Sequence, residues 1–139
     1  MEWYQLNQTD ILSLLLFDSD VHPTHNRPTY NDYINAFDLG FEFYALKEIS
    51  TSINIISTFQ LLMIDNHTTL LAGVGVHPIY RHAGYGKKII NTAIEKSNTQ
   101  DLICHTDIDN YAMNSLLNKF NFNVDTYEGT KIIWKKILE

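Results

Sequence analysis

Residues 74–88 read VGVHPIYRHAGYGKK, and this stretch gives the strongest indication of what the chain binds. β-Branched residues lead up to Pro78, a short segment with Arg81 follows, and Gly84 and Gly86 open a helix with an apolar stripe. A glycine turn and a helix N-terminus both point backbone N–H groups outward, and a Cβ there would block a ligand or forbid the turn. The pattern therefore predicts a cradle for an anion such as phosphate.

This cradle matches neither of two common phosphate-binding loops. A Walker loop needs Gly-Lys followed by Ser or Thr, whereas Lys87 is followed by Lys88. A dinucleotide fingerprint needs a third glycine, which the segment Gly84-Tyr85-Gly86 lacks, and the segment before it has an antiparallel pattern. The sequence predicts a different kind of anion site.

Hydrophobic periodicity predicts a mixed α/β protein around the cradle. Thr29 can cap a helix that ends at Gly40, and Asn110 can cap a later helix. The expected element order is β-α-α-β-β-β-α-β-α-β-β. The expected strands are residues 3–6, 41–47, 53–64, 68–76, 102–108, 123–127 and 131–137.

The first helix and the segment after it are less clearly patterned. The apolar set expected on one face of that helix is Ile11, Leu12, Leu15 and Leu16. Residues 18–28 contain two prolines and predict a loop. The pair His22 and His25 has a spacing that suits a metal, but no third ligand accompanies it, so we expect loop residues and no metal site.

Composition limits the classes of function. The chain has 139 residues and a formal charge of −6, and 45% of its residues are apolar, so we expect one globular domain over residues 1–139. The acidic balance argues against nucleic acid as a partner, because phosphates are neutralised by clustered Lys and Arg. Cys104 is the single cysteine, which excludes an internal disulfide. The longest apolar run, residues 11–17, is too short for a membrane span, so we expect a soluble cytoplasmic protein.

Two segments carry a resemblance to a known family. Residues 81–86, RHAGYG, match the signature Arg/Gln-x-x-Gly-x-Gly/Ala and resemble the acetyl-CoA-binding motif of the GNAT superfamily of N-acetyltransferases. Residues 110–122, NYAMNSLLNKFNF, resemble the family's second motif, Asn-x-x-Ala-x-x-Leu-Tyr-x-Lys-x-Gly-Phe. The resemblance implies the GNAT fold, a mostly antiparallel twisted sheet flanked by helices, and transfer of an acetyl group from acetyl-CoA to a primary amine.

The resemblance also assigns residues to the cofactor. It implies that the pyrophosphate of CoA lies on the amides of residues 82–87, assisted by Arg81 and the two lysines that follow Gly86. It implies that the pantetheine arm pairs with the strand ending at Val76, whose N–H would polarise the thioester carbonyl, and that Asn110 touches the pantetheine or the leaving sulfur. The full set is Val74, Gly75, Val76, Arg81, His82, Ala83, Gly84, Tyr85, Gly86, Lys87 and Asn110.

The catalytic groups are less clear. Some relatives carry a carboxylate five residues before the motif asparagine; here that position is His105, a competent base near neutral pH. Asp107 and Glu42 are rival candidates, while Glu48 is expected to be a solvated strand end. The usual general acid is the motif tyrosine, which is Leu117 here. Either another group or solvent protonates the thiolate, or the chain is a catalytically inactive CoA-binding module.

Other properties stay open at this level. Cys104 is expected to be a core residue rather than a nucleophile for an acyl-cysteine route. The acidic composition suits a cationic acceptor, but no motif selects one. Relatives often dimerise through edge strands or the final hairpin, so a homodimer is one expectation.

Overall fold

The computed structural model describes residues 2–22, 27–48 and 55–138. Its elements, in chain order, are β1 (Glu2–Leu6), η1 (Gln8–Asp10), α1 (Ile11–Val21), α2 (Tyr30–Leu39), β2 (Glu42–Lys47), β3 (Ile55–Met63), β4 (Thr68–Val76), η2 (Pro78–Tyr80), α3 (Tyr85–Lys96), β5 (Asp101–Asp107), α4 (Tyr111–Lys119), β6 (Asn123–Glu128) and β7 (Lys131–Ile137). The predicted order of strands and helices is confirmed.

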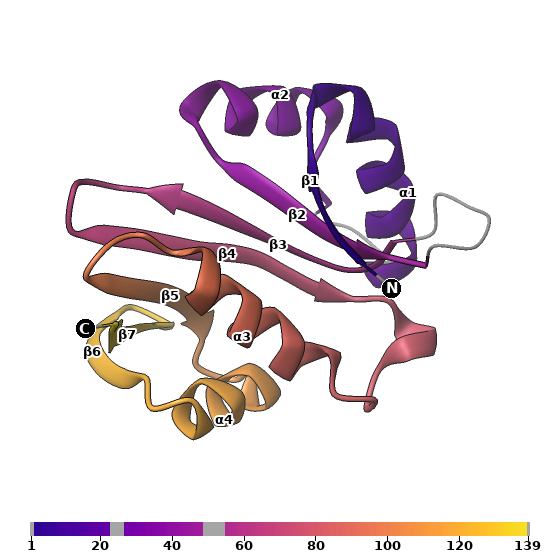
Figure 1. Ribbon diagram of the computed structural model, residues 1–139. Coiled ribbons are helices and arrows are strands. Elements are labelled where there is room, and N and C mark those ends of the chain that lie inside the picture. Colours follow the sequence, from indigo (N-terminus) through magenta and orange to yellow (C-terminus); the bar gives the residue numbers. More distant parts are fainter. Residues whose placement is uncertain (1, 23–26, 49–54, 139) are drawn as a thin grey trace.

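All seven strands join one sheet in the order β1-β2-β3-β4-β5-β7-β6. Each neighbouring pair is antiparallel except β4 and β5, which are parallel because α3 crosses over between them. Helices α1 and α2 cover one face of the sheet, and α3 and α4 lie on the opposite face (Figure 1). The fold class expected from the sequence, a mostly antiparallel α/β sheet flanked by helices, is confirmed.

The core is divided between the two faces. Beneath α3 and α4 the buried side chains include Phe59, Ile89 and Leu117, and beneath α1 and α2 they include Ile11, Phe43 and Tyr33. Fully burying one such side chain stabilises a protein by about 1.5–3 kcal/mol, so both clusters hold their helices on the sheet.

Local capping explains why α2 begins and ends where the sequence predicts. The Thr29 hydroxyl accepts a hydrogen bond from the Asp32 N–H at 3.2 Å, and the Asp32 carboxylate accepts one from the Thr29 N–H at 2.8 Å. Gly40 ends the helix with φ of +100°, in the left-handed region that favours glycine. Both predicted signals are confirmed.

Two expectations for the N-terminal region are wrong. The buried face of α1 is formed by Ile11, Leu14, Phe17 and Asp18, while Leu12 and Leu16 are 68% exposed. The helix also continues to Val21 and so includes the first four residues of the expected loop. Leucines surround this helix on all sides, so apolar spacing alone does not choose its buried face. His25 and the first two residues of the strand expected at 53–64 lie outside the described residues.

Candidate functional site

An irregularity in β4 creates the site. Thr58 pairs with Gly75 but Gln60 pairs with Ala72, so one residue of β3 faces two residues of β4. Gly73 is one of these two β4 residues, and its φ is +59°. A Cβ at this position would lie 2.3 Å from Nε2 of Gln60. This is a β-bulge, which bends the strand and increases its twist. The bulge is not among the features predicted from the sequence, although a glycine inside a strand pattern is its usual signal.

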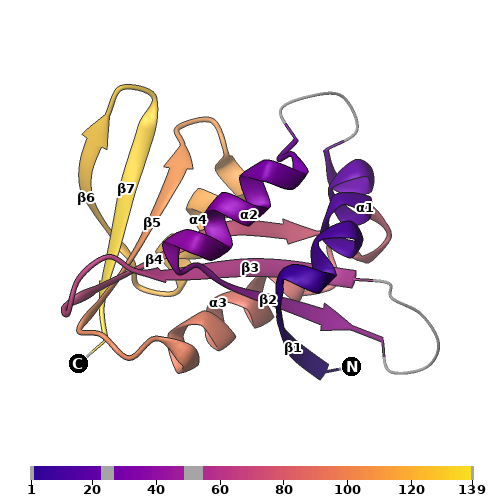
Figure 2. The same ribbon diagram turned by 90° about the horizontal axis from the view of Figure 1, so that it is seen from above.

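Beyond the bulge, β4 and β5 separate. Their parallel pairing begins at Thr68–Asp101 and ends at Leu71–Cys104, yet β4 continues to Val76 and β5 to Asp107. Figure 2 shows the two strands pointing in different directions past this point. The gap is part of a cleft with a volume of about 860 Å³.

Among the described residues, the lining of the cleft contains no Asp or Glu. It includes Arg81, Lys87 and Lys119, with His82 and His105, although the chain as a whole carries a charge of −6. The remaining lining residues are Leu71, Ala72, Gly73, Val74, Gly75, Val76, Tyr80, Gly84, Tyr85, Gly86, Cys104, Thr106, Asn110, Ala112, Met113, Ser115 and Leu116. Such local charge separation favours an anionic ligand in an otherwise acidic protein.

The turn before α3 forms one end of the cleft. His82 and Gly84 have φ of +64° and +87°, and α3 then begins with no side chain capping its first turn and no acidic residue in that turn. The first N–H groups of a helix have no partner within the helix, and its N-terminus carries a partial positive charge. The turn therefore has the character of the anion cradle that the sequence predicts.

Three contacts hold this turn in place. The Arg81 Nε donates to the Val76 carbonyl oxygen at 3.2 Å. The Tyr80 hydroxyl donates to Glu48 at 3.2 Å, and burial together with this carboxylate raises the pKa of Tyr80. His77 Nε2 lies 3.2 Å from the Asp20 carboxylate of α1. The cradle is thus held to Glu48, the residue after β2, and to β4 and α1.

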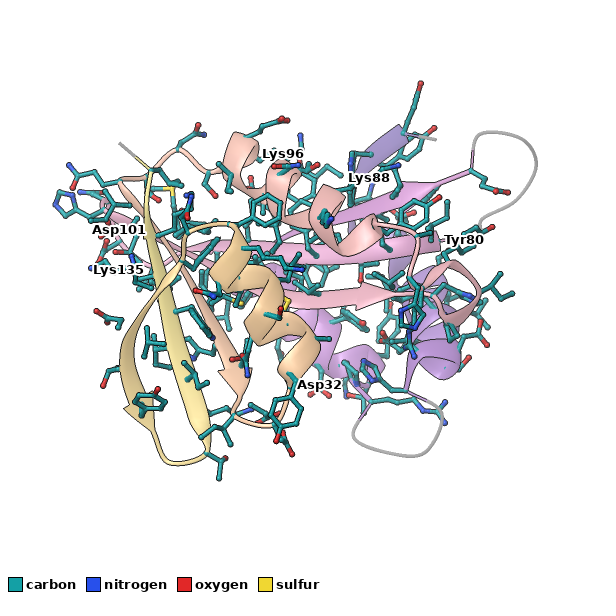
Figure 3. The ribbon with its side chains drawn as sticks, turned by 90° about the horizontal axis from the view of Figure 1, so that it is seen from below. Asp32, Tyr80, Lys88, Lys96, Asp101 and Lys135 are labelled. Carbon is teal, nitrogen blue, oxygen red and sulfur yellow. The ribbon has the colours of Figure 1, made fainter. Side chains whose placement is uncertain are left out.

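Not every residue assigned to the cofactor faces the cleft. Ala83 is exposed and is not part of the lining. Tyr85 lines the cleft but is 9% exposed, and Lys88 stands over its ring with Nζ 4.8 Å from the centroid. Figure 3 shows Lys88 and Tyr80 on the side of the molecule near the start of α3, with Lys96 at the helix's other end.

Asn110 and Gly86 bring α4 to the opposite wall. The Asn110 side chain accepts a hydrogen bond from the Met113 N–H at 3.3 Å, so it caps α4 as predicted while also lining the cleft. A Cβ at Gly86 would lie 3.1 Å from Cδ2 of Leu116. Gly86 therefore allows the first turn of α3 to approach α4 closely.

His105 lies where the two strands part. Alternation along β5 turns Leu102 and Cys104 toward α3 and α4, so His105 points to the other face of the sheet, next to the last β4–β5 pair. Its side chain is exposed and lines the cleft. An imidazole there can reach the gap from the side opposite the anion cradle.

The rival carboxylates have other partners. Asp107 lies 2.7 Å from Nζ of Lys131 on β7 and is not part of the lining. Glu42 accepts a hydrogen bond from Tyr44 at 3.2 Å and lines a separate cavity of about 190 Å³ beside Lys96, at the C-terminal end of α3. Burial and Glu42 raise the pKa of Tyr44 to about 12. The structure therefore does not bring Glu42 to the cleft, because alternation along β2 turns it toward the far end of α3.

A hydrogen-bonded network behind the cleft was not anticipated. Thr106, a buried lining residue, donates to Asn114 Oδ1 at 2.5 Å and accepts from Trp134 Nε1 at 3.0 Å. Asn114 also donates to the carbonyl oxygens of Asp107 and Ile108 at 3.2 and 3.3 Å. These contacts fix the end of β5, and with it His105, against α4 and β7. They join residues too distant in sequence for any pattern to reveal.

Two further expectations concern Leu117 and metal binding. Leu117 has no exposed surface and packs in the core, outside the cleft. Within residues 2–22, 27–48 and 55–138, no group of three or more His, Cys, Asp or Glu side chains is arranged so that it could bind a metal ion. None of the described helices is long and apolar enough to cross a membrane.

Comparison with known proteins identifies the family of this chain. The sequence matches the acetyltransferase (GNAT) family over residues 4–122. No functionally curated protein is similar enough in sequence to count as a match.

Solved structures share the fold at low sequence identity. The PaiA N-acetyltransferase of Thermoplasma acidophilum, solved with coenzyme A, is 18% identical with a TM-score of 0.78 and 98% of each chain covered. A putative acetyltransferase (yncA) of Salmonella typhimurium, solved with acetyl-CoA, is 14% identical with a TM-score of 0.72, covering 100% of this chain and 94% of its own. The spermidine N-acetyltransferase of Vibrio cholerae, solved with CoA and spermine, is 12% identical with a TM-score of 0.72, covering 96% and 92%. With the family match spanning most of its length, the chain belongs to the GNAT family of acetyltransferases.

Proposed function

We propose that this protein transfers the acetyl group of acetyl-CoA to a primary amine, which attacks the thioester directly in the β4–β5 cleft. The observation that carries the proposal is the acid-free lining of that cleft in a chain with a charge of −6. CoA is polyanionic, so an acidic protein must bind it through local charge rather than through its overall field.

The cradle suits the pyrophosphate of CoA. The N–H groups of residues 82–87 and the uncapped start of α3 supply donors and a partial positive charge. Arg81 adds a full charge, and its bond to Val76 holds the guanidinium at the cleft. Three known proteins of this fold were solved with CoA or acetyl-CoA, which supports the same cofactor here.

The free edge of β4 suits the pantetheine arm. Beyond Leu71 this strand has no β5 partner, so its β5-facing backbone groups are available to an extended amide-bearing chain, except the Val76 carbonyl oxygen, which accepts from Arg81. At the end of this edge, the Val76 N–H would donate to the thioester oxygen and stabilise the oxyanion of the tetrahedral intermediate.

His105 is the general base that we propose for the attacking amine. It lines the cleft from the face opposite the cradle, where an acceptor can enter without displacing CoA. Asp107 is a weaker candidate because Lys131 already neutralises its carboxylate at 2.7 Å. Removal of the amine proton by a positioned base typically accelerates such a step by about 10²–10⁴-fold.

Cys104 does not suit an acyl-enzyme route. Burial raises the pKa of its thiol to about 12, so the thiol stays protonated at neutral pH. Direct attack by the amine needs no such nucleophile, and the acetyl group then passes to the amine while the CoA thiolate takes a proton from solvent.

A second function, CoA binding without turnover, is favoured by one observation. Leu117 occupies the position of the family's usual proton donor and is buried in the core, so no side chain at that position reaches the sulfur. We rank it second because a CoA thiolate can leave without a dedicated acid.

Release of free thiol from acetyl-CoA separates the two functions. The panel should contain polyamines, since a structural relative was solved with spermine, together with small amines and peptides with free N-termini. Acetyl transfer predicts faster thiol release with at least one class and an acetylated product. Calorimetric binding of CoA without stimulation by any class would favour the binding module instead.

A further inference from the structure

Thr106 presents a buried hydroxyl to the cleft. Its side chain is 4% exposed and belongs to the lining, on the same face of β5 as Cys104. Cys104 belongs to the last pair between β5 and β4, so Thr106 lies just beyond the point where these strands part. An arm bound along the free edge of β4 would lie in this gap, between that edge and Thr106.

The hydrogen bonds of Thr106 leave its O–H free to turn toward a ligand. Thr106 donates to Asn114 Oδ1 at 2.5 Å and accepts from Trp134 Nε1 at 3.0 Å. The same Trp134 N–H lies 3.2 Å from Asn114 Oδ1. If the Thr106 O–H turned into the cleft, Asn114 Oδ1 would still have the Trp134 N–H as a donor. The turn therefore avoids the high cost of an unpaired buried acceptor.

Other hydroxyls that line the cleft are placed differently. Tyr80 donates its O–H to Glu48, Tyr85 lies in the first turn of α3 beside the anion cradle, and Ser115 is exposed on α4. Thr106 combines burial with a position at the gap between the two strands. Its hydroxyl is therefore the one best placed to meet the reacting end of a bound thioester.

The sulfur of a thioester becomes a stronger hydrogen-bond acceptor as acetyl transfer proceeds. The C–S bond breaks and its electron pair stays on sulfur, so negative charge develops there. A hydrogen bond to a charged acceptor is roughly twice as strong as one between neutral groups. A donor at this place therefore stabilises the transition state more than the bound substrate, and it raises kcat rather than affinity.

We propose that the Thr106 hydroxyl donates a hydrogen bond to the sulfur of acetyl-CoA and stabilises the leaving thiolate. This inference rests on the proposed acetyl transfer in the cleft. The hydroxyl keeps its proton, since an alcohol is a far weaker acid than a thiol, and solvent supplies the proton that the thiolate finally takes. The Trp134 N–H polarises the hydroxyl and makes it a better donor. Thr106 thus supplies part of what the buried Leu117 cannot.

The test compares Thr106→Val and Thr106→Ala, which remove the hydroxyl, with Thr106→Ser, which keeps it. Thr99→Val is the matched control, because Thr99 also has a buried, hydrogen-bonded hydroxyl but lies before β5 and outside the lining. With acetyl-CoA and the best amine, the first two variants should lose about tenfold to a hundredfold in kcat at a nearly unchanged KM for acetyl-CoA. Thr106→Ser and Thr99→Val should keep most of the wild-type kcat.

Titration of the thiol of bound CoA adds a measurement that does not involve His105. The ultraviolet absorbance of the thiolate follows the titration, and Thr106→Val should raise the pKa of this thiol relative to the wild-type complex. A lower kcat with an unchanged thiol pKa would mean that the variant only displaces His105, and the proposal would be wrong. An equal loss of kcat in Thr99→Val would also overturn it.

Failure of the proposed function gives a different result. A wild type that acetylates no amine would contradict acetyl transfer itself. A wild type that acetylates an amine, together with a fully active Thr106→Val, would contradict only the role of Thr106.

Discussion

Replacing Gly84 by glutamate should lower the stability of the protein slightly and its affinity for CoA strongly. Gly84 has φ of +87°, so any L-residue there is strained, but a Cβ would meet no atom within 4 Å. The left-handed conformation costs about 1–2 kcal/mol for such a residue. We therefore expect Gly84→Glu to fold with Tm lowered by about 4–8 °C.

The effect on binding should be much larger. Gly84 is exposed and lines the cleft, so the new carboxylate would lie beside the pyrophosphate bound at the turn. At a separation of about 5 Å, each pair of like charges costs about 1–3 kcal/mol for effective dielectric constants between 80 and 20. CoA affinity should therefore fall by at least tenfold, and by more than a hundredfold if the site is dry.

Calorimetry with CoA and thermal unfolding, measured on the same variants, test this reasoning. Gly129→Glu is the matched control: Gly129 also has a positive φ, of +59°, and open space, but lies in the β6–β7 hairpin at the edge of the sheet. It should lose similar stability and keep its CoA affinity. Gly84→Gln separates charge from bulk. Wild-type affinity in folded Gly84→Glu would refute the placement of the pyrophosphate.

Three further variants address catalysis, pH and stability. His105→Ala should lower kcat by about 10²-fold or more with unchanged CoA affinity, whereas Asp107→Asn should change kcat less than threefold; steady-state kinetics on the best amine compares them. Burial raises the pKa of Asp18 above its ordinary value of 3.8, because the folded protein favours the protonated carboxyl. The stabilisation of the folded state by this protonation is complete below pH 3.8 and is lost as the pH rises through the raised pKa. Asp18→Asn, which can still accept the hydrogen bond from Tyr33, should therefore raise Tm most at neutral pH and progressively less toward pH 4; an equal gain at all pH values would contradict this. Lys87→Glu should stabilise the unliganded protein by about 0.3–1 kcal/mol, seen as a higher urea midpoint, because an anion suits the start of α3; a lower midpoint would mean that Lys87 is not in conflict with the helix dipole.

Local signals in the sequence predicted the elements well. Thr29, Gly40 and Asn110 mark helix ends because their effect depends on hydrogen bonds and backbone angles within a few residues. The cradle belongs to the same class, since the glycine conformation and the helix start are both local. That is why the glycine turn and the start of α3 could be predicted without knowledge of the sheet topology.

Features that depend on distant partners could not be predicted. The bulge at Gly73 is defined by the register against β3, and the burial of Leu14 rather than Leu12 depends on which side of α1 meets the sheet. Glu42 is a candidate base by sequence because it lies near the central strands, but alternation along β2 turns its side chain toward the end of α3 and away from the cleft. Long-range packing decided each of these.

Direct acetyl transfer can be tested by single-turnover mixing of the protein with acetyl-CoA labelled in the acetyl group, followed by a primary amine. We expect label to appear on the amine as fast as CoA thiol is released, with none retained on the protein. If acetyl-CoA stays bound and intact with every class of amine, or if label accumulates on Cys104, direct acetyl transfer in the β4–β5 cleft is contradicted.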